Sequence, residues 1–330
     1  LQDLLTRVAD TGRLPEPEPS FPCSGRMLEF PGFHQTLAAL AKLVYGYCEI
    51  KLLESINFKD KWGMSFLRSD WRHANLRESI EVKLPPGRSW NVPFLYTHNG
   101  RTYCFVEDDV FKRKPRRSHI TVLEITADGV IELGVCLEEP FHLAFPFLFN
   151  YNGSLYMCPE SGDAAQIRVY RCTDFPLKWE LCAVIMEGVS AVNTMLFQYQ
   201  DKWWLLTNID RSGTDDCCSE LYLFFAESPL DTDWKPHAKN PVRIDSDGGR
   251  NAGLILENGR IFRLGQRHGY DQYGEGVIVF EIKELSESTY VEQPVTEINA
   301  SFRKGLRGTH HCSTSGTTTV VDHVSRSFVF

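Results

Sequence analysis

Residues 142–162 read HLAFPFLFNYNGSLYMCPESG, and residues 91–109 read NVPFLYTHNGRTYCFVEDD. Both stretches pass through an apolar run with a Pro-Phe pair near its start to Asn-Gly, and then through aromatic residues to an acidic end. Asn-Gly between two apolar runs is the strongest short signal for a β-hairpin with a two-residue turn. Each stretch therefore predicts a pair of antiparallel strands, and the chain contains this hairpin at least twice.

Three further stretches follow the same outline: residues 193–208 (NTMLFQYQDKWWLLTN), residues 251–266 (NAGLILENGRIFRLGQ) and, more weakly, residues 311–322. The turn centres of the five copies are Gly100, Gly153, Asp201, Gly259 and Gly316. A period of roughly 50–60 residues in a β-rich sequence is typical of propeller blades. Five hairpins therefore predict five blades.

Each of the first four hairpins is followed by a third alternating run and by a final edge segment, which makes the four strands of a blade. The edge segments are residues 130–137, 179–186, 234–242 and 290–298. The fifth unit is cut short, and residues 61–69 (KWGMSFLRS), which precede the first repeat, are expected to complete it and to close the ring. Closure removes exposed sheet edges. The predicted fold is an all-β, five-bladed β-propeller over residues 61–330.

Residues 1–60 differ from the repeats, and we expect them to form a Pro-rich linker and an amphipathic helical extension. Residues 14–22 read LPEPEPSFP, and residues 33–55 have helical periodicity. Leu37, Leu40, Val44 and Tyr47 fall on one stripe of that helix. The stripe is expected to pack on the propeller flank or on a neighbouring domain; the alternative is an interfacial membrane helix, for which the modest, balanced charge is less typical.

Composition restricts the class of protein. The net charge of −8 argues against nonspecific nucleic-acid binding. No apolar run reaches ~18 residues and no secretory signal is visible, so membrane contact is expected only at the surface and the expected location is cytoplasmic. None of the 10 cysteines forms a Cys-x-x-Cys pair, so we expect reduced thiols and no structural zinc. No Gly-rich phosphate loop occurs, and no cofactor is expected.

The repeat predicts where polar side chains gather. In a propeller the innermost strand of each blade lines a central channel, so polar residues at that strand's start and at the hairpin's far end converge on one mouth of it. The residues expected to contact a ligand there are Glu107, His119, His142, Glu160, Asn193, Arg250, Asn251, Gln266 and His310. Amides, carboxylates and imidazoles match sugar hydroxyls, which both donate and accept hydrogen bonds. The alternative is that these side chains only cap backbone groups and tie blades together.

The acidic run at residues 107–109 and the pair His310-His311 contain residue types that can ligate metal ions. A solvated loop is the expected structure of the acidic run, with a cation site as the alternative. Adjacent residues on a strand point to opposite faces, so the two histidines do not face one ion. No metal site is predicted.

Several short segments of the sequence resemble those of a known family: HLAFPFLFNYNGSLYMCPES, then FPLKW, WKPHAKNPV, RNAG and LGQ…YG. The chain from Trp62 onward resembles the N-terminal propeller of plant glucosamine inositolphosphorylceramide transferases and of bacterial relatives, some of which follow a formyltransferase-like domain. The glycosyltransferase domain of the plant enzymes has no counterpart in this sequence. The resemblance therefore implies a propeller that serves a sugar-transferring or formylating partner domain.

The family's propeller is in turn similar to five-bladed family 43 glycoside hydrolases, which use a base, a general acid and a third carboxylate that tunes the acid. At the position that this resemblance implies for the base the chain has Val92, and at that of a second carboxylate it has Asn193. Only Glu160 remains in a place suited to a general acid. One carboxyl cannot serve as both acid and base in glycoside hydrolysis.

These observations favour a carbohydrate-recognition module that binds a glycan, glycolipid or nucleotide sugar in its central funnel, in association with sugar transfer or sugar formylation. The first alternative is a glycosidase or transglycosidase that uses Glu160 as its general acid. The second is a propeller that has no catalytic role and only mediates assembly. Whether the chain is an enzyme stays open at this point.

Overall fold

The computed structural model describes residue 9 and residues 31–56, 58–111, 114–115, 117–127, 129–211, 216–269 and 272–328. The predicted Pro-rich linker at residues 14–22 lies outside these ranges. The chain divides into two compact units, Leu1–Ser55 and Ile56–Phe330. In the first, helix α2 spans Phe33–Ser55, as the periodicity predicts, and the side chains of its apolar stripe are exposed. None of the described helices combines the length and the apolar character that crossing a bilayer requires.

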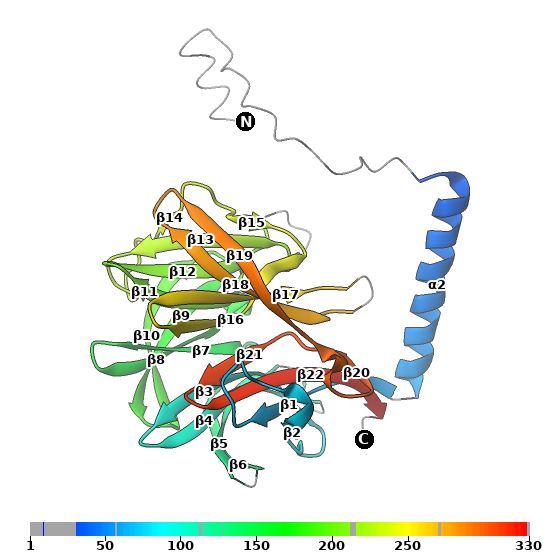
Figure 1. Ribbon diagram of the computed structural model, residues 1–330, viewed down its shortest axis with the longest axis horizontal. Coiled ribbons are helices and arrows are strands. Elements are labelled where there is room, and N and C mark those ends of the chain that lie inside the picture. Colours follow the sequence, from blue (N-terminus) through cyan, green and yellow to red (C-terminus); the bar gives the residue numbers. More distant parts are fainter. Residues whose placement is uncertain are drawn as a thin grey trace. The chain divides into compact units, whose positions relative to one another are not determined.

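The second unit is a five-bladed β-propeller, which confirms the predicted fold (Figure 1). Blade one contains β3 (Arg88–His98), β4 (Arg101–Val110), β5 (His119–Thr126) and β6 (Gly129–Leu137). Blade two contains β7 (Ala144–Tyr151), β8 (Ser154–Glu160), β9 (Gln166–Asp174) and β10 (Lys178–Glu187). Blade three contains β11 (Ala191–Tyr199), β12 (Lys202–Ile209), β13 (Glu220–Ala226), β14 (Lys235–Pro236) and β15 (Arg243–Ile244). Blade four contains β16 (Asp247–Glu257), β17 (Arg260–Arg267), β18 (Gly276–Leu285) and β19 (Tyr290–Asn299). Blade five contains β20 (Leu306–Gly308), β21 (Cys312–Ser315), β22 (Thr318–Phe328), β1 (Phe58–Leu67) and β2 (Ile80–Glu81). Short 3-10 turns are Leu76–Glu78, Gly162–Ala164 and Ala300–Phe302.

The hairpin turns adopt the conformation that their residues favour. Asn99 and Gly100 have φ values of 49° and 75°, and Asn152 and Gly153 have 47° and 75°. Positive φ at both central residues is the mark of a type I′ turn, whose twist matches that of the flanking strands. Local turn chemistry therefore sets the register of the inner two strands in each of these blades.

Ring closure joins the two ends of the second unit. Strand β1 pairs antiparallel with β22 over ten consecutive positions, from Phe58 opposite Phe328 to Leu67 opposite Thr319. Figure 1 shows the blue β1 beside the red β22. Met64 and Phe66 of β1 are buried. The prediction that residues 61–69 complete blade five is confirmed.

The outer strands are shorter than predicted in one blade. Residues 234–242 form only the two-residue strand β14 beside β13, and β15 adds two residues at the other end. Proline lacks the N–H that a sheet ladder needs, and this segment contains Pro236 and Pro241. In blade five the outer strand β2 also has two residues.

The core is divided among the spaces between blades. One cluster, which includes Phe105 and Met157, packs blade one against blade two. Another, which includes Phe66 and Trp90, packs blade five against blade one. Buried aromatic and aliphatic side chains therefore pack neighbouring blades against each other.

Candidate functional site

Seven of the nine predicted side chains line one chamber of about 200 Å³ at the axis. They come from all five blades, because the inner strand of each blade begins, and its second strand ends, at this mouth of the propeller. The seven are Glu107, His142, Glu160, Asn193, Arg250, Gln266 and His310. The same chamber is lined by Trp62, Asn91, Val92, Ala144, Phe145 and Tyr273.

A bulge near the start of the inner strand re-aims side chains in the first three blades. The register shifts between Asn91 and Phe94, between Ala144 and Phe147, and between Val192 and Met195. At these bulges, three residues without the freedom of glycine have positive φ: Val92 at 50°, Phe145 at 46° and Asn193 at 51°. Bulges next to sites commonly turn a side chain out of the pleat. Here they turn successive residues of each blade toward the axis.

Glu107 ends on the chamber wall in a network of neutral donors. Its Oε2 accepts a hydrogen bond of 2.9 Å from Asn91 Nδ2, and its Oε1 accepts one of 3.1 Å from Ser118 Oγ. His142 Nε2 lies 3.6 Å from the same Oε1. Burial raises the pKa of Glu107, and the nearby charge of His142 offsets only part of that effect. A carboxyl in this setting can hold a proton at a pH where an exposed glutamate cannot.

Glu160, Asn193 and Arg250 form a second network in the chamber's lining. Glu160 Oε2 accepts the backbone N–H of Asn193 at 3.2 Å and lies 3.7 Å from an Arg250 guanidinium nitrogen. Arg250 also donates to Asn193 Oδ1 at 3.1 Å. Asn193 Nδ2 donates to the carbonyl of Asn251 at 2.6 Å. These contacts join blades two, three and four at the chamber.

His310 is held by the last blade. Its Nδ1 lies 2.5 Å from Asp322 Oδ2, and the other oxygen, Oδ1, accepts the backbone N–H groups of His310 and His311 at 2.9 Å each. Although burial by itself raises the pKa of Asp322, the contacts with His310 lower it below its ordinary value. The adjacent His311 points away from the chamber and contacts the carbonyl of Pro93. Asp322 lies on β22, which pairs with the closing strand β1, and it therefore links that pair of strands to His310 in the chamber wall.

An aromatic wall was not part of the predicted site. Trp62 stacks on His310 with ring centroids 3.9 Å apart, and Tyr273 packs edge-on to His310 at 5.3 Å. Burial raises the pKa of Tyr273 to about 12, so its hydroxyl stays protonated. Trp62 lies on the closing strand and Tyr273 in the loop after β17. Neither residue lies in a repeated hairpin, so the repeat did not predict them. Trp62 does fall within residues 61–69, which were expected to close the ring.

Two predicted residues lie outside the chamber lining. His119 is 6% exposed, and its Nε2 is 3.4 Å from Asp108 Oδ2. It begins a third strand, which is farther from the axis than the inner two. Asn251 is fully buried and donates to the carbonyl of Asn193 at 3.0 Å. Its role is therefore to tie blade three to blade four.

The acidic run at residues 107–109 is not a solvated loop, which corrects the expectation from sequence. All three residues belong to β4, and Asp108 is fully buried on the face opposite Glu107. Asp108 pairs with Arg88 and accepts a hydrogen bond of 2.7 Å from Thr121 Oγ1. Among the described residues, no group of three or more His, Cys, Asp or Glu side chains is arranged to hold a metal ion.

Apart from His310 Nδ1, which lies beside Asp322, three polar atoms on the chamber's side chains are buried and have no hydrogen-bond partner within the described part of the chain: Asn91 Oδ1, Arg250 Nε and Gln266 Oε1. Buried polar groups in folded proteins are almost always paired with protein, water or ligand. These two acceptors and one donor lie around one small chamber, and together they suit a ligand that both donates and accepts hydrogen bonds.

A second chamber of about 370 Å³ adjoins the first and shares Trp62, Asn91, Glu107 and His142 with it. Its further lining is Asp60, Ser89, Asp109, Phe111 and Ser118. The site therefore extends outward from the axis between blade five and blade one. Its combined extent suits a ligand larger than one small ring.

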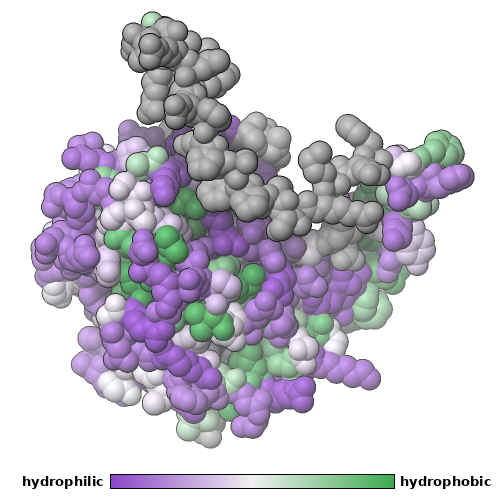
Figure 2. Space-filling model, turned by 45° about the horizontal axis from the view of Figure 1, so that its top comes forward, coloured by the Kyte–Doolittle hydropathy of each residue, from purple (hydrophilic) through white to green (hydrophobic). Residues whose placement is uncertain are grey.

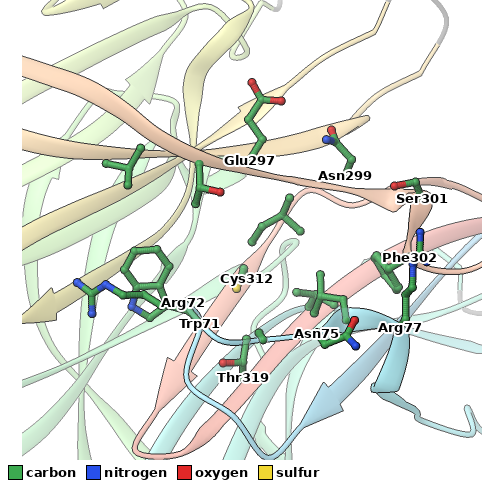
Figure 3. Close-up of a pocket in the computed structure, with 16 residues that line it drawn as sticks. Trp71, Arg72, Asn75, Arg77, Glu297, Asn299, Ser301, Phe302, Cys312 and Thr319 are labelled. Carbon is green, nitrogen blue, oxygen red and sulfur yellow. The ribbon is translucent and has the colours of Figure 1, made fainter.

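A groove of about 480 Å³ lies apart from the axis, between blades four and five (Figure 3). Five consecutive residues of the edge strand β19, 295–299, face Trp71, Asn75 and Phe302 across it. Several of its polar groups already have partners, such as Thr319 Oγ1, which donates to the carbonyl of Ser69 at 2.7 Å. Elsewhere on the face in Figure 2, hydrophilic residues predominate and apolar ones form scattered groups.

Comparison with known sequences gives one consistent result. Residues 81–315 match the profile of the N-terminal region of glucosamine inositolphosphorylceramide transferase 1. The transferase of that name from Arabidopsis thaliana is 36% identical over 224 residues, which are 64% of this chain and 28% of the relative. The one from Oryza sativa subsp. japonica is 34% identical over 219 residues, which are 64% of this chain and 29% of the relative. The matched region thus spans less than a third of these proteins.

Comparison with solved structures supports the fold alone. A thermostable family 43 glycoside hydrolase has a TM-score of 0.54 at 15% identity, covering 74% of this chain and 92% of that one. A family 117 glycoside hydrolase from Zobellia galactanivorans has a TM-score of 0.52 at 11% identity, covering 83% of this chain and 92% of that one. The sequence match covers well over half of the chain, and the chain therefore belongs to the family defined by the N-terminal region of glucosamine inositolphosphorylceramide transferase 1.

Proposed function

We propose that this propeller is a carbohydrate-recognition module that binds a glycan, a glycolipid or a nucleotide sugar in its axial chamber. In this role it serves a domain or partner that transfers or formylates sugars. The relatives are named for transfer of glucosamine to inositolphosphorylceramide, so a glycolipid bearing a sugar headgroup is the first ligand class to consider.

The observation that carries the proposal is the set of unpaired polar atoms around the chamber. Asn91 Oδ1 and Gln266 Oε1 are free acceptors, and Arg250 Nε is a free donor, within the part of the chain that the structure describes. Sugar hydroxyls satisfy both kinds of atom. Trp62 and Tyr273 offer aromatic surface to the C–H face of a sugar ring.

A binding screen with glycans and nucleotide sugars, followed by calorimetry on the best ligand, tests this proposal. Glu160→Gln keeps the shape of the side chain and removes its charge, and we expect it to weaken binding about tenfold because charged hydrogen bonds contribute about 1.5–3 kcal/mol. Glu139→Gln is the matched control, since Glu139 accepts from Tyr170 and does not line the chamber. Absence of saturable binding across the screen would refute the proposal.

A glycosidase or transglycosidase is the second candidate, because Glu107 and Glu160 line the same small chamber. Burial raises the pKa of Glu107, which suits the role of a general acid. At the position of the hydrolases' base, however, Val92 cannot accept a proton. Release of free sugar from the identified ligand, abolished separately by Glu107→Gln and by Glu160→Gln, would favour the enzyme; bound ligand without turnover would favour the module.

A further inference from the structure

A third hollow, about 440 Å³ in volume, lies on blade five and shares Trp62 with the axial chambers. It lies along the edge of β1 at residues 61–63. Strand β2 pairs with β1 only at Ser65 and Phe66, so the edge beyond this point is not covered by β2. The lining comprises Lys61, Trp62, Gly63, Glu81, Val82, Lys83, Leu84, His323, Ser325 and Ser327. We call this hollow the lysine groove.

The lysine groove carries positive charge that the described residues do not neutralise. Lys61 and Lys83 both line it, and neither forms an ion pair within the described part of the chain. The one carboxylate of its lining, Glu81, is 2.8 Å from a guanidinium nitrogen of Arg303 and is thereby neutralised. The chain has a net charge of −8, so the groove is a local region of positive charge on a negatively charged protein.

The floor of the groove adds neutral donors. His323, Ser325 and Ser327 alternate along β22, so their side chains share one face. Gly63 is opposite His323, and a Cβ built on it would lie 3.4 Å from His323 Cε1 and 3.9 Å from Nδ1. The missing side chain therefore opens space beside that edge of the imidazole.

His323 is held against Ser65. Ser65 Oγ lies 3.0 Å from His323 Nε2 and accepts a hydrogen bond of 3.3 Å from Arg303. Burial lowers the pKa of His323, so the imidazole adds no positive charge near neutrality. The positive charge of the groove therefore comes from its two lysines.

We propose that the lysine groove binds a phosphate group. Two ammonium groups and two serine hydroxyls line the groove, and these are donors that phosphate oxygens accept from. Free phosphate, a sugar phosphate and a lipid headgroup share this chemistry. The phosphate site does not depend on the proposed sugar binding, because apart from Trp62 the two linings share no residue.

Calorimetry on the full chain at constant ionic strength tests this proposal. Inorganic phosphate should bind saturably at one site, and the Lys61→Ala/Lys83→Ala double variant should bind it about tenfold or more weakly. The control is Lys235→Ala/Lys239→Ala, which removes the same net charge at exposed positions outside the groove. Equal affinity in the wild type and the groove variant, or an equal loss in the control, would overturn the site.

Two more measurements separate the alternatives. Gly63→Ala, which fills the floor without removing charge, should also weaken phosphate binding, whereas Glu160→Gln should leave it unchanged, so a failed sugar site and a failed phosphate site give different results. Titration with N-acetylglucosamine 1-phosphate and with phosphatidylcholine vesicles, with and without phosphatidylinositol, then identifies the source by the tighter binding. No saturable binding of any of these probes would refute the proposal.

Discussion

At the scale of single residues, Glu107 and Asp108 show how one strand gives neighbours opposite chemistry. Adjacent residues of β4 face opposite sides, so Glu107 borders the axial chamber and Asp108 lies inside blade one. Burial raises the pKa of Glu107. Burial would also raise that of Asp108, but contacts with His119 and Arg88 lower its pKa well below the ordinary range.

These opposite shifts predict opposite pH dependences. Above the ordinary pKa of glutamate, about 4.3, the folded state holds the Glu107 proton more tightly than the unfolded state does, so the free energy of unfolding falls as pH rises through that window. Glu107→Gln cannot ionise. Its stability relative to wild type should therefore increase from about pH 4 toward neutrality, as measured by urea unfolding at a series of pH values.

The matched variants make that trend specific. The pKa of Asp108 is lowered by folding, so its stabilising effect is present above its unfolded value of about 3.9 and is lost as pH falls. Asp108→Asn should cost about 3 kcal/mol near neutrality and less in acid, because it breaks a buried ion pair with Arg88. Glu284→Gln, at an exposed position, should show neither trend. A pH-independent difference for Glu107→Gln would contradict the proposed cause.

Val92 predicts a second residue-scale effect. Its φ of 50° is strained for a β-branched residue, and the matching position of blade three holds Asn193 at 51° without that penalty. Val92→Asn should therefore stay within about 1 kcal/mol of wild type, whereas Val122→Asn, at a fully buried position of β5, should cost about 3 kcal/mol. Equal losses in thermal or chemical unfolding would show that backbone strain at Val92 is negligible.

At the scale of elements, we expect the strand β1 to contribute strongly to the stability of the propeller, although it precedes the repeats in the sequence. It supplies the third strand of blade five, and its Phe66, 1% exposed, packs between blades five and one. Phe66→Ala should lower the free energy of unfolding by about 3–5 kcal/mol, because the cavity remains inside the closure. Leu256→Ala, at a position 56% exposed, should stay within about 0.5 kcal/mol. Comparable losses at both positions would argue against closure as the cause.

At the scale of the whole molecule, closure lies entirely within the second unit. A chain that starts at residue 56 retains β1 and should unfold at the same temperature as the full chain's propeller. A chain that starts at residue 68 lacks β1 and leaves an edge of β22 unpaired over ten positions, so it should aggregate or fail to fold. Calorimetry and gel filtration of the two truncated chains check this, and equal behaviour would mean that closure is dispensable.

The sequence alone determined the ring. Asn-Gly turns, alternating apolar runs and a regular period are local signals, and each one acts over a few residues, so the blades, the helix α2 and the closing strand could all be predicted. The convergence of Glu107, Glu160, Asn193 and Gln266 followed from that symmetry. Only the tertiary structure decided which side chains face the hollow. The bulges that turn Val92 and Asn193 inward, the burial of His119 and Asp108, and the aromatic wall of Trp62 and Tyr273 arise where strands from different blades meet. Packing between segments far apart in the sequence leaves no periodic mark on either of them.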